Sequence, residues 1–394
     1  MEILKSNNYQ YHIADNNLLD YIIDDFFENH INTKKLKKYY RKTIHNQKEL
    51  LTIKLLIKTF INLFKSNNHP TSFYKTILRK IKFTLNIKEY LNNKRILLFI
   101  INIYLYYENE LQKNSLIDFN DMINKCTVSI KEHGLKQKWK YIIIDEYQDT
   151  SLSKFNMINE ILEVTKSKLL VVGDDFQSIY RFTGCNLDVF LNFNKYYKDA
   201  EIMPIINTYR NPQELIDIAG NFIMKNKKQM KKDLHSNKHI KVPLYISLNN
   251  NKKQALKRVL SIIESKDIFV IGRNNNDIKM YIDNEYQRKD DYYTYQNKTF
   301  RYLTIHKSKG LESEVVIIIN ALDDILGLPS QIKSDKILKY VNNTKDYYPY
   351  EEERRLFYVA LTRTKSKVYI ISSKDNPSIF VKELLKDNHN ITIL

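Results

Sequence analysis

The chain has 394 residues, of which 43% are apolar, enough for two or three domains with buried cores. Its formal net charge of +18 favours a polyanionic partner, and nucleic acid is the commonest partner of that kind. The chain is also rich in Asn, Lys, Ile and Tyr, as an AT-rich coding sequence would make it, so the charge supports such a partner without establishing it.

Composition also argues against some protein classes. The longest apolar stretch, residues 96–107, is broken by Asn102 and is shorter than the ~20 residues that span a bilayer. No amino-terminal signal is visible, so we expect a cytoplasmic protein with no membrane partner. Cys126 and Cys185 are the only cysteines, and neither lies near a histidine or a second cysteine. The sequence therefore predicts no disulfide framework, zinc site or redox chemistry.

Residues 1–115 show helical spacing of apolar residues and no strand alternation. Leu18, Leu19, Ile22, Ile23, Phe26 and Phe27 recur at three- and four-residue steps, which predicts an all-helical subdomain. Asp118 is a plausible cap for a further helix. Two lysine-rich clusters, residues 34–42 and 225–232, are interpreted as solvated helix faces.

Two apolar runs, each followed by paired carboxylates, come next in the chain. Residues 141–144 (Tyr-Ile-Ile-Ile) precede Asp145 and Glu146, and residues 168–172 precede Gly173-Asp174-Asp175. An Ile-rich run of this kind is typical of a parallel strand covered on both faces, and open α/β sheets bind ligands beyond the carboxyl ends of such strands. The alternative for each run is a strand that leads into a polar turn.

A second α/β domain is predicted after residue 197. A strand is expected at residues 202–206, before Arg210, and further strands at residues 268–272, 302–306, 315–319 and 368–371. Residues 245–254 and 273–301 are rich in Lys and Asn and are interpreted as loops or short insertions.

Five segments, in this order, resemble the motor of UvrD/Rep-type superfamily 1 DNA helicases, and most closely the DNA helicase IV branch. They are residues 142–150, 171–182 (Val-Val-Gly-Asp-Asp-Phe-Gln-Ser-Ile-Tyr-Arg-Phe), 208–210 (Thr-Tyr-Arg), 304–312 (Thr-Ile-His-Lys-Ser-Lys-Gly-Leu-Glu) and 351–363. The resemblance implies two RecA-like P-loop NTPase domains with an inserted helical subdomain. The implied boundaries are 1–115 for the helical subdomain, 116–197 for the rest of the first RecA-like domain and 198–394 for the second.

The resemblance assigns the nucleotide chemistry to particular residues. Phosphoryl transfer needs a carboxylate for Mg²⁺, a group that acts on water and cations around the γ-phosphate. By resemblance Asp145 holds the metal, Glu146 acts on the water, and the Gln177 amide reaches the γ-phosphate or the water. The alternative for Gln177 is an ordinary loop side chain.

The resemblance also assigns Arg210 and Arg363 to the γ-phosphate of ATP. Leu356, Val359, Ala360 and Arg363 fall at helical steps, so Arg363 is expected in a helix at the end of a buried stripe. The alternative for Arg363 is a snorkelling side chain over the rim of the core.

Further matches to the family concern the adenine base of ATP, the motif that couples nucleotide binding to DNA, and the contacts with DNA. Tyr209 matches an aromatic that stacks on adenine, although it could instead be a core residue. Gly310 and Glu312 match a motif that couples nucleotide to DNA and touches the ribose or phosphate region. Phe182 stands where relatives commonly carry a Trp that stacks on a base of single-stranded DNA, and a core position is its alternative. The remaining expected nucleic-acid contacts are Tyr180, Thr304 and His306.

One element expected from the resemblance is absent from the sequence. None of the seven glycines belongs to a Gly-x-x-Gly-x-Gly-Lys-Thr loop, which would hold the phosphates of ATP. The first RecA-like domain is therefore expected to be incomplete. A truncated gene, a split motor completed by another polypeptide, and a degenerate relative kept for binding are the three explanations.

The resemblance implies an ATP-dependent DNA helicase or translocase that acts on single-stranded DNA and duplex junctions and is inactive alone without that loop. Its 3′ to 5′ polarity is implied by the family and not by these residues. The alternative is a catalytically silent protein that binds nucleic acid or another partner. The pathway (repair, recombination, replication restart or phage defence) stays open.

Overall fold

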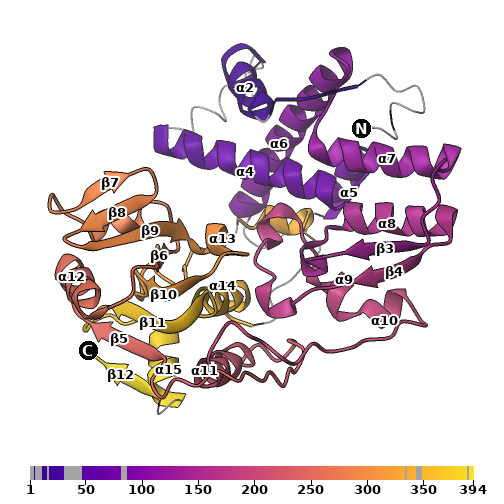
Figure 1. Ribbon diagram of the computed structural model, residues 1–394. Helices are drawn as coiled ribbons and strands as arrows, with labels where there is room; N and C mark the ends of the chain where they lie inside the picture. The colour runs from indigo at the N-terminus through magenta and orange to yellow at the C-terminus, as the bar shows by residue number, and fades with distance from the viewer. Residues whose placement is uncertain are drawn as a thin grey trace. The chain divides into compact units, whose positions relative to one another are not determined.

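The computed structural model describes Leu4 and residues 11–15, 17–30, 47–80, 87–332, 335–342, 348–387 and 390–394. The lysine-rich cluster at residues 34–42 lies outside these ranges. The chain forms two compact units of mixed α/β structure (Figure 1). The first comprises residues 1–173, 180–192 and 334–345, and the second comprises residues 174–179, 193–333 and 346–394.

The first unit is mainly helical, as the spacing of its apolar residues predicts. Its longer helices are α2 (Leu18–Asp25), which continues as a π-helix (Phe26–His30), α4 (Gln47–Ser66), α5 (Phe73–Lys80), α6 (Ile87–Lys113), α7 (Phe119–His133) and α8 (Leu152–Thr165), and α9 (Leu187–Leu191) is short. The predicted cap is confirmed, because Asp118 accepts a hydrogen bond of 2.8 Å from the Asp121 amide. A short parallel pair, β1 (His12–Ile13) and β2 (Leu116–Ile117), was not predicted.

A late segment of the chain completes the core of this helical unit. Ile337 and Val341 flank the 3₁₀ turn η6 (Leu338–Tyr340) and are buried together with residues of α4 and α6 such as Phe64 and Tyr104. Asn67 donates a hydrogen bond of 2.9 Å to the Val341 carbonyl. The helical unit is therefore closed by residues about 270 positions further along the chain.

The first unit also contains a two-stranded parallel sheet, β3 (Tyr141–Ile144) with β4 (Lys168–Val171). Both strands were predicted, but the expected cover on both faces is wrong. Exposure alternates along each strand, and Ile143 and Leu170 are 69% and 50% exposed. In the described part of the chain one face of this sheet remains uncovered.

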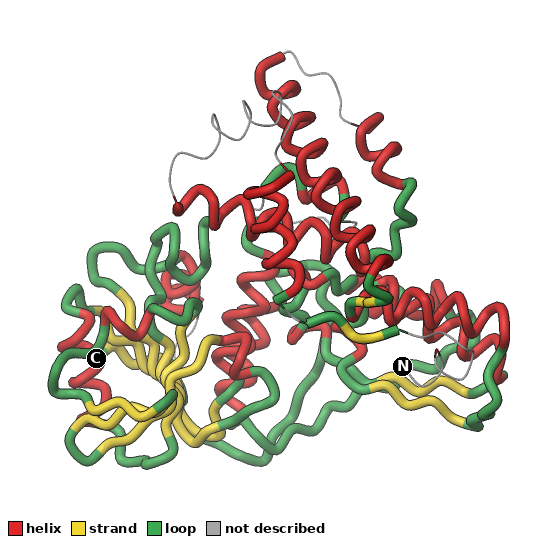
Figure 2. Tube along the Cα trace, turned by 90° about the horizontal axis from the view of Figure 1, so that it is seen from above, coloured by secondary structure: helices red, strands yellow, loops and turns green. Residues whose placement is uncertain are grey.

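The second unit is built on an eight-stranded sheet in the order β12-β5-β11-β10-β6-β9-β8-β7. Its parallel strands are β5 (Leu244–Leu248), β6 (Ile268–Gly272), β9 (Lys298–Thr304), β10 (Ser313–Ile318), β11 (Thr364–Ser372) and β12 (Ile391–Ile393). The hairpin β7 (Gln287–Lys289) and β8 (Tyr292–Tyr295) joins the β9 edge in antiparallel order. In Figure 2 the strands fan out around one another, as expected for a twisted sheet.

Helices cover both faces of this sheet. On one face α12 (Lys252–Ile262) packs through Leu256 and Val259 against sheet residues such as Val270 and Ile317. On the other side α11 (Gln213–Ile223), α14 (Glu351–Leu361) and α15 (Ile379–Asp387) meet through contacts among the Phe222, Phe357 and Phe380 rings. The short helices α10 (Phe193–Tyr196) and α13 (Ile305–Ser308) also belong to this unit.

Three of the strands predicted for this domain are confirmed, at β6, β10 and β11. The strand predicted at residues 302–306 is confirmed only as far as Thr304, because Ile305 begins α13. Residues 273–301, interpreted as loops or short insertions, contain β7, β8 and the start of β9. The strand predicted at residues 202–206 is wrong: these residues are exposed and irregular, and their only pairing in the described chain is an isolated bridge at the next residue, Asn207. Residues 244–248, assigned mostly to a loop, form the buried strand β5.

Candidate functional site

Asp145 and Glu146 form a sharp turn directly after β3 in the first unit. The Glu146 amide donates to Asp145 Oδ1 at 2.8 Å, and Glu146 adopts the left-handed conformation with φ of 51°. This conformation is costly for a residue other than glycine, and such strain is often kept at functional sites. Both carboxylates are exposed, and Glu146 Oε2 accepts a hydrogen bond from the Gln148 side chain.

Position 173, which follows β4, requires glycine because the Asp145–Gln148 turn and the Phe190 ring pack closely against it. A Cβ atom at position 173 would lie 2.5 Å from Gln148 Oε1 and 2.6 Å from the Phe190 ring. The Tyr147 amide also donates to the Val172 carbonyl at 2.9 Å. The ends of β3 and β4 are therefore packed together.

Asp145 fits a magnesium ligand by its chemistry. It is an exposed carboxylate at the carboxyl end of a parallel strand, and Mg²⁺ in nucleotide sites commonly takes one or two carboxylates together with water and substrate phosphates. No cluster of three or more His, Cys, Asp or Glu side chains that could hold a metal by itself occurs among the described residues.

The segment Asp174–Gln177 belongs to the second unit, where it is held by Lys232. Lys232 Nζ pairs with Asp174 and lies 2.5 Å from Asp175 Oδ1. Asp175 is fully buried and also accepts from the Met230 amide at 2.9 Å. Gln177 Nε2 then donates to Asp174 Oδ2 at 2.7 Å, so these ion pairs fix the Gln177 amide.

Arg363 is a buried cation that contacts Gln177. Its side chain is 1% exposed, and Nη2 donates to Gln177 Oε1 at 3.0 Å. Nε donates to the Val359 carbonyl at 3.0 Å, so the guanidinium folds back onto α14. The structure corrects one expectation, because Arg363 lies two residues past the end of α14 rather than in a helix. Its burial excludes the alternative of a snorkelling side chain.

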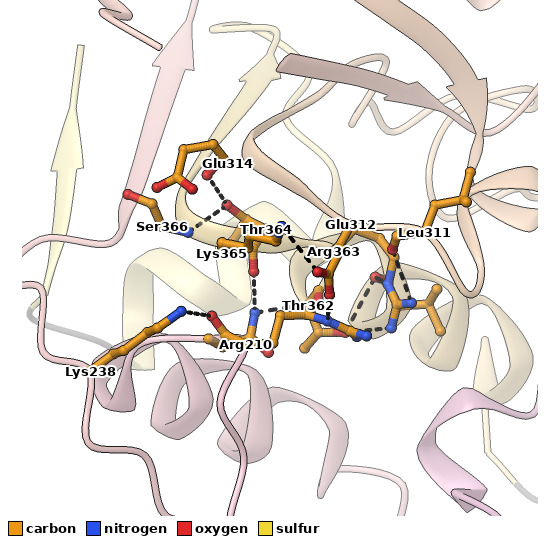
Figure 3. Close-up of polar contacts among 12 residues, drawn as sticks. Arg210, Lys238, Leu311, Glu312, Glu314, Thr362, Arg363, Thr364, Lys365 and Ser366 are labelled. Atoms are coloured by element: carbon orange, nitrogen blue, oxygen red, sulfur yellow. Dashed lines mark hydrogen bonds and ion pairs between the residues drawn. The ribbon is translucent and has the colours of Figure 1, made fainter. Parts of the chain in front are cut away.

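Arg210 is held close to the residues that follow α14 (Figure 3). Arg210 Nε donates to Glu312 Oε2 at 2.8 Å, and Lys365 Nζ lies 3.1 Å from Glu312 Oε1. The hydrogen bonds from Arg210 and Lys365 lower the pKa of the Glu312 carboxyl. The neighbouring Asn211 donates to the Thr364 carbonyl at 2.7 Å, which fixes the backbone next to Arg210.

The aromatic candidates are exposed, which excludes the core alternatives. Tyr209, in the second unit, is 77% exposed, and Phe182, in the first, is 53% exposed. Tyr180 lies beside Phe182, with ring centroids 6.2 Å apart. Gly184, which follows, has φ of +95°, and a Cβ there would lie 1.9 Å from Ser66 Oγ, so this turn is packed against the end of α4.

Thr304 and His306 lie where β9 leads into α13. Thr304 is 9% exposed and accepts a hydrogen bond from the Lys307 amide at 3.3 Å. Burial, reinforced by the charge of Arg273, lowers the pKa of His306 to about 4. His306 is therefore neutral near pH 7. Gly310, four residues further on, has φ of +80°, a conformation that favours glycine.

The predicted site residues fall into two sets. Asp145, Glu146, Tyr180 and Phe182 belong to the first unit, and the other predicted residues belong to the second. Within the second unit the structure brings Gln177 to Arg363 and Arg210 to Glu312.

The sequence interpretation missed residues that hold these groups in place. Lys232 was assigned to a solvated helix face, but α11 ends at Ile223 and Lys232 pairs with Asp174 and Asp175. Arg355 is 2% exposed and donates to the Ser178 carbonyl at 2.8 Å. The signal for Lys232 was its charge together with two consecutive aspartates, but the partner lies more than 50 residues away in sequence.

Among the residues that the structure describes, no helix combines the length and the apolar character that crossing a membrane requires.

Two family models match the chain, that of the UvrD/REP helicase N-terminal domain over residues 2–198 and that of the UvrD-like helicase C-terminal domain over residues 284–375. Together with the sheet and the Gln177–Arg363 contact, these matches define the class of the protein as a superfamily 1 helicase. The first match covers half of the chain, and the chain belongs to the UvrD/Rep family.

Curated relatives agree with this assignment. DNA helicase IV of Escherichia coli (strain K12) is 28% identical over 284 residues, covering 71% of this chain and 40% of that protein. A probable DNA helicase II homolog of Mycoplasma capricolum is 32% identical over 238 residues, covering 54% of this chain and 32% of that protein. A probable DNA helicase of Mycoplasma pneumoniae is 25% identical over 306 residues, covering 72% and 55%. The chain thus spans between 32% and 55% of the length of these relatives.

Proposed function

We propose that the chain carries part of the motor of an ATP-dependent 3′ to 5′ DNA helicase or translocase, which acts on single-stranded DNA and duplex junctions in the cytoplasm. In this proposal the second unit is a RecA-like domain, and β3 and β4 belong to another. The observation that carries the proposal is the contact of the buried Arg363 guanidinium with Gln177 Oε1 at 3.0 Å. A fixed cation beside a fixed amide can stabilise a phosphoryl group during its transfer.

ATP and Mg²⁺ are the proposed cofactors. Asp145 would hold Mg²⁺ and Glu146 would orient or deprotonate the attacking water, for which an exposed pair at the end of β3 is suited. Gln177, Arg210 and Arg363 would contact the γ-phosphate.

Two further groups complete the proposed nucleotide site. The Tyr209 ring, 77% exposed, is free to stack on adenine. Gly310 and Glu312 would contact the ribose or phosphate region of ATP. The Arg210–Glu312 ion pair links this segment to Arg210, which would contact the γ-phosphate.

Single-stranded DNA is the proposed substrate along which the motor moves. Phe182, supported by Tyr180, would stack on a base, and stacking of this kind tolerates any sequence. Thr304 and neutral His306 would contact the strand by hydrogen bonding. Base-independent contacts suit a translocating motor.

No Gly-Lys-Ser or Gly-Lys-Thr occurs in the 394 residues, so we propose that another polypeptide segment supplies the phosphate-binding loop. Without the backbone amides and the lysine of such a loop, the β- and γ-phosphates lose their main contacts. The chain alone is therefore expected to bind ATP weakly and to hydrolyse it very slowly.

The test is ATP hydrolysis stimulated by single-stranded DNA, measured for the chain alone and together with the product of the neighbouring reading frame. The proposal predicts turnover in the combined sample that Glu146→Gln abolishes. Arg363→Ala should lower the rate roughly 10³- to 10⁵-fold. Salt-sensitive DNA binding with no turnover in any combination would instead support a silent nucleic-acid-binding protein.

A further inference from the structure

Lys232 lies outside the five segments that carry the resemblance, yet it contacts the residues that precede Gln177. Its Nζ forms ion pairs with Asp174 and, at 2.5 Å, with Asp175 Oδ1. It also lies 3.9 Å from the centroid of the Phe176 ring. Three consecutive residues therefore contact one cation, and that cation belongs to the same compact unit as they do.

The partners of the Gln177 side chain fix the orientation of its amide. Gln177 Nε2 donates to Asp174 Oδ2 at 2.7 Å, and Gln177 Oε1 accepts from Arg363 Nη2 at 3.0 Å. An ionised carboxylate only accepts hydrogen bonds and a guanidinium only donates them, so the reverse orientation of the amide would lose both bonds. Lys232 pairs with Oδ1 of the same carboxylate and thereby holds Asp174 in place.

Asp175 ties this arrangement to the interior of the second unit. It is fully buried, and its Oδ2 accepts from Gln229 Nε2 at 2.6 Å and from the Met230 amide at 2.9 Å. Burial raises the pKa of the Asp175 carboxyl, and the charge of Lys232 opposes that rise. A buried carboxylate without a cation is costly, so Lys232 offsets part of the cost of burying Asp175.

The segment that carries Lys232 is also joined to α14. Arg355 on α14 donates to Gln229 Oε1 at 3.2 Å. Asn226 donates at 3.0 Å to the carbonyl of Glu351, the first residue of α14. This segment is therefore fixed to the helix that leads to the buried arginine of the candidate site.

We propose that Lys232 is a positioning residue for ATP hydrolysis, which acts through Asp174 to hold the Gln177 amide with its Oε1 on Arg363. The inference deepens the proposed function and rests on it, because that function assigns Gln177 and Arg363 to the γ-phosphate. Lys232 itself contacts the two aspartates and is not assigned to the nucleotide. A displacement of about 1 Å in such a site can lower a rate about 100-fold.

The variants separate this role from the burial of Asp175. Lys232→Met removes the cation and keeps an unbranched side chain. Because it leaves Asp175 buried without that cation, Lys232→Met is made in an Asp175→Asn background, and Asp175→Asn alone is the reference. Lys232→Arg keeps the positive charge. Lys231→Met is the matched control, since Lys231 is the exposed neighbour.

The first measurement is hydrogen exchange of the purified chain alone, detected by mass spectrometry. The Phe176 amide donates at 3.0 Å to Asp174 Oδ1, which also contacts Lys232, and the Gln177 amide donates to the Asp174 carbonyl at 3.0 Å. Relative to the reference, Lys232→Met should raise the exchange rates of these two amides roughly 3- to 10-fold. The amides of β10 should exchange as before, and Lys231→Met should change neither set.

The second measurement is ATP hydrolysis with Mg²⁺ and single-stranded DNA by the chain combined with the polypeptide that supplies the phosphate-binding loop. Relative to the reference, Lys232→Met should lower kcat roughly 10- to 100-fold and leave KM for ATP within about 2-fold. Lys232→Arg, in the unsubstituted background, should keep most of the rate, and Lys231→Met should keep all of it.

The outcomes distinguish the two proposals. Unchanged exchange at Phe176 and Gln177 would overturn the positioning of the amide by Lys232, whatever the rate. Faster exchange without a loss of kcat would overturn its role in hydrolysis and leave the proposed function standing. Absence of turnover by the unsubstituted combination would contradict the proposed function, and the exchange result would still decide whether Lys232 positions Gln177.

Discussion

Arg363 is charged and fully buried, and the oxygen atoms that accept its hydrogen bonds explain how the fold tolerates it. Val359 and Leu311 provide carbonyl oxygens and Gln177 an amide oxygen, at 3.0, 3.5 and 3.0 Å. Burying a charge is costly unless it is well hydrogen-bonded, and an anion at the site would stabilise it further. The arrangement is what the proposed contact of Arg363 with a phosphate requires.

Phe182 should contribute to DNA affinity through stacking alone. Because its ring is 53% exposed, Phe182→Ala removes little core packing. We expect binding of single-stranded DNA to weaken by roughly 1 to 3 kcal/mol, with thermal stability nearly unchanged. Fluorescence anisotropy measures the affinity. Phe119→Ala is the control, since Phe119 belongs to the same unit and is 55% exposed, and an equal loss in both variants would contradict the assignment.

His306 should make the stability of the second unit depend on pH. Its pKa in the folded protein is about 4, below the usual 6.5, so between these values the unfolded chain binds a proton that the folded chain does not. Stability is then fully present above pH 6.5 and is lost as the pH falls towards 4.

The loss attributable to His306 should reach at most roughly 3 kcal/mol in free energy of unfolding. Urea denaturation of the protein and of His306→Gln at several pH values measures it, because other titrating groups cancel in the difference. A difference that stays constant from pH 7 to pH 4 would show that the imidazole titrates normally.

At the scale of elements, Lys65 joins three parts of the helical unit. Its ammonium group on α4 lies 2.7 Å from Glu108 on α6, 2.6 Å from Asp118 at the cap of α7 and 2.7 Å from Asp121. Burial lowers the pKa of Lys65, but the three carboxylates outweigh it and raise the pKa above its usual value. Lys65 therefore stays charged.

Lys65→Met should lower the free energy of unfolding by roughly 3 kcal/mol, because it leaves one buried and two partly buried carboxylates without their counter-charge. The matched control is Lys58→Met on the same helix, whose 2.7 Å pair with Asp20 is about 40% exposed. That change should cost about 0 to 1 kcal/mol. Urea denaturation followed by circular dichroism compares the two. Similar losses in both variants would contradict a special role for the buried cluster.

The open face of β3 and β4 should make the isolated chain self-associate. Tyr141 and Ile143 on β3 and Leu170 on β4 are 57%, 69% and 50% exposed, and Val172, directly after β4, is 40% exposed. A two-stranded sheet with an apolar face is marginal in water and invites further contacts.

Replacing Ile143 and Leu170 by Thr keeps strand propensity and should reduce association with a change in stability within about 0.5 kcal/mol. Sedimentation velocity at several concentrations measures association. Unfolding of the double variant would show that these side chains are part of a packed core.

The elements also show where sequence patterns are informative. The strands at β6, β9, β10 and β11 were predictable from their apolar runs, and in the structure each of these runs pairs with neighbouring strands of the sheet. Residues 202–206 are also mostly apolar, but they include Pro204, which cannot donate a hydrogen bond to a strand ladder, and they pair with no strand in the described chain. Strand β5 was missed because Asn-rich residues follow its short apolar run, although Leu244 and Ile246 are fully buried by the sheet.

At the scale of the whole molecule, segments that are adjacent in the sequence belong to different compact units. Asp174–Gln177 belongs to the second unit although β4 belongs to the first, and residues 334–345 return to the helical unit. The roles of the motif residues were inferred from the resemblance and remain predictions. Their supports, Lys232 and Lys365, were not predictable, because ion pairs across 50 or more residues leave no local pattern.

The central claim is that the cations of the second unit recognise the γ-phosphate of ATP. The most direct test compares the affinities of ATP and ADP, with Mg²⁺, for the chain combined with the polypeptide that supplies the phosphate-binding loop. Arg210→Ala is the informative variant because the Arg210 side chain is 32% exposed and its loss should not unfold the protein. The account predicts that ATP binds more tightly than ADP and that Arg210→Ala and Arg363→Lys each reduce this difference. Equal affinities for ATP and ADP, or a preference for ATP that survives both substitutions, would contradict it.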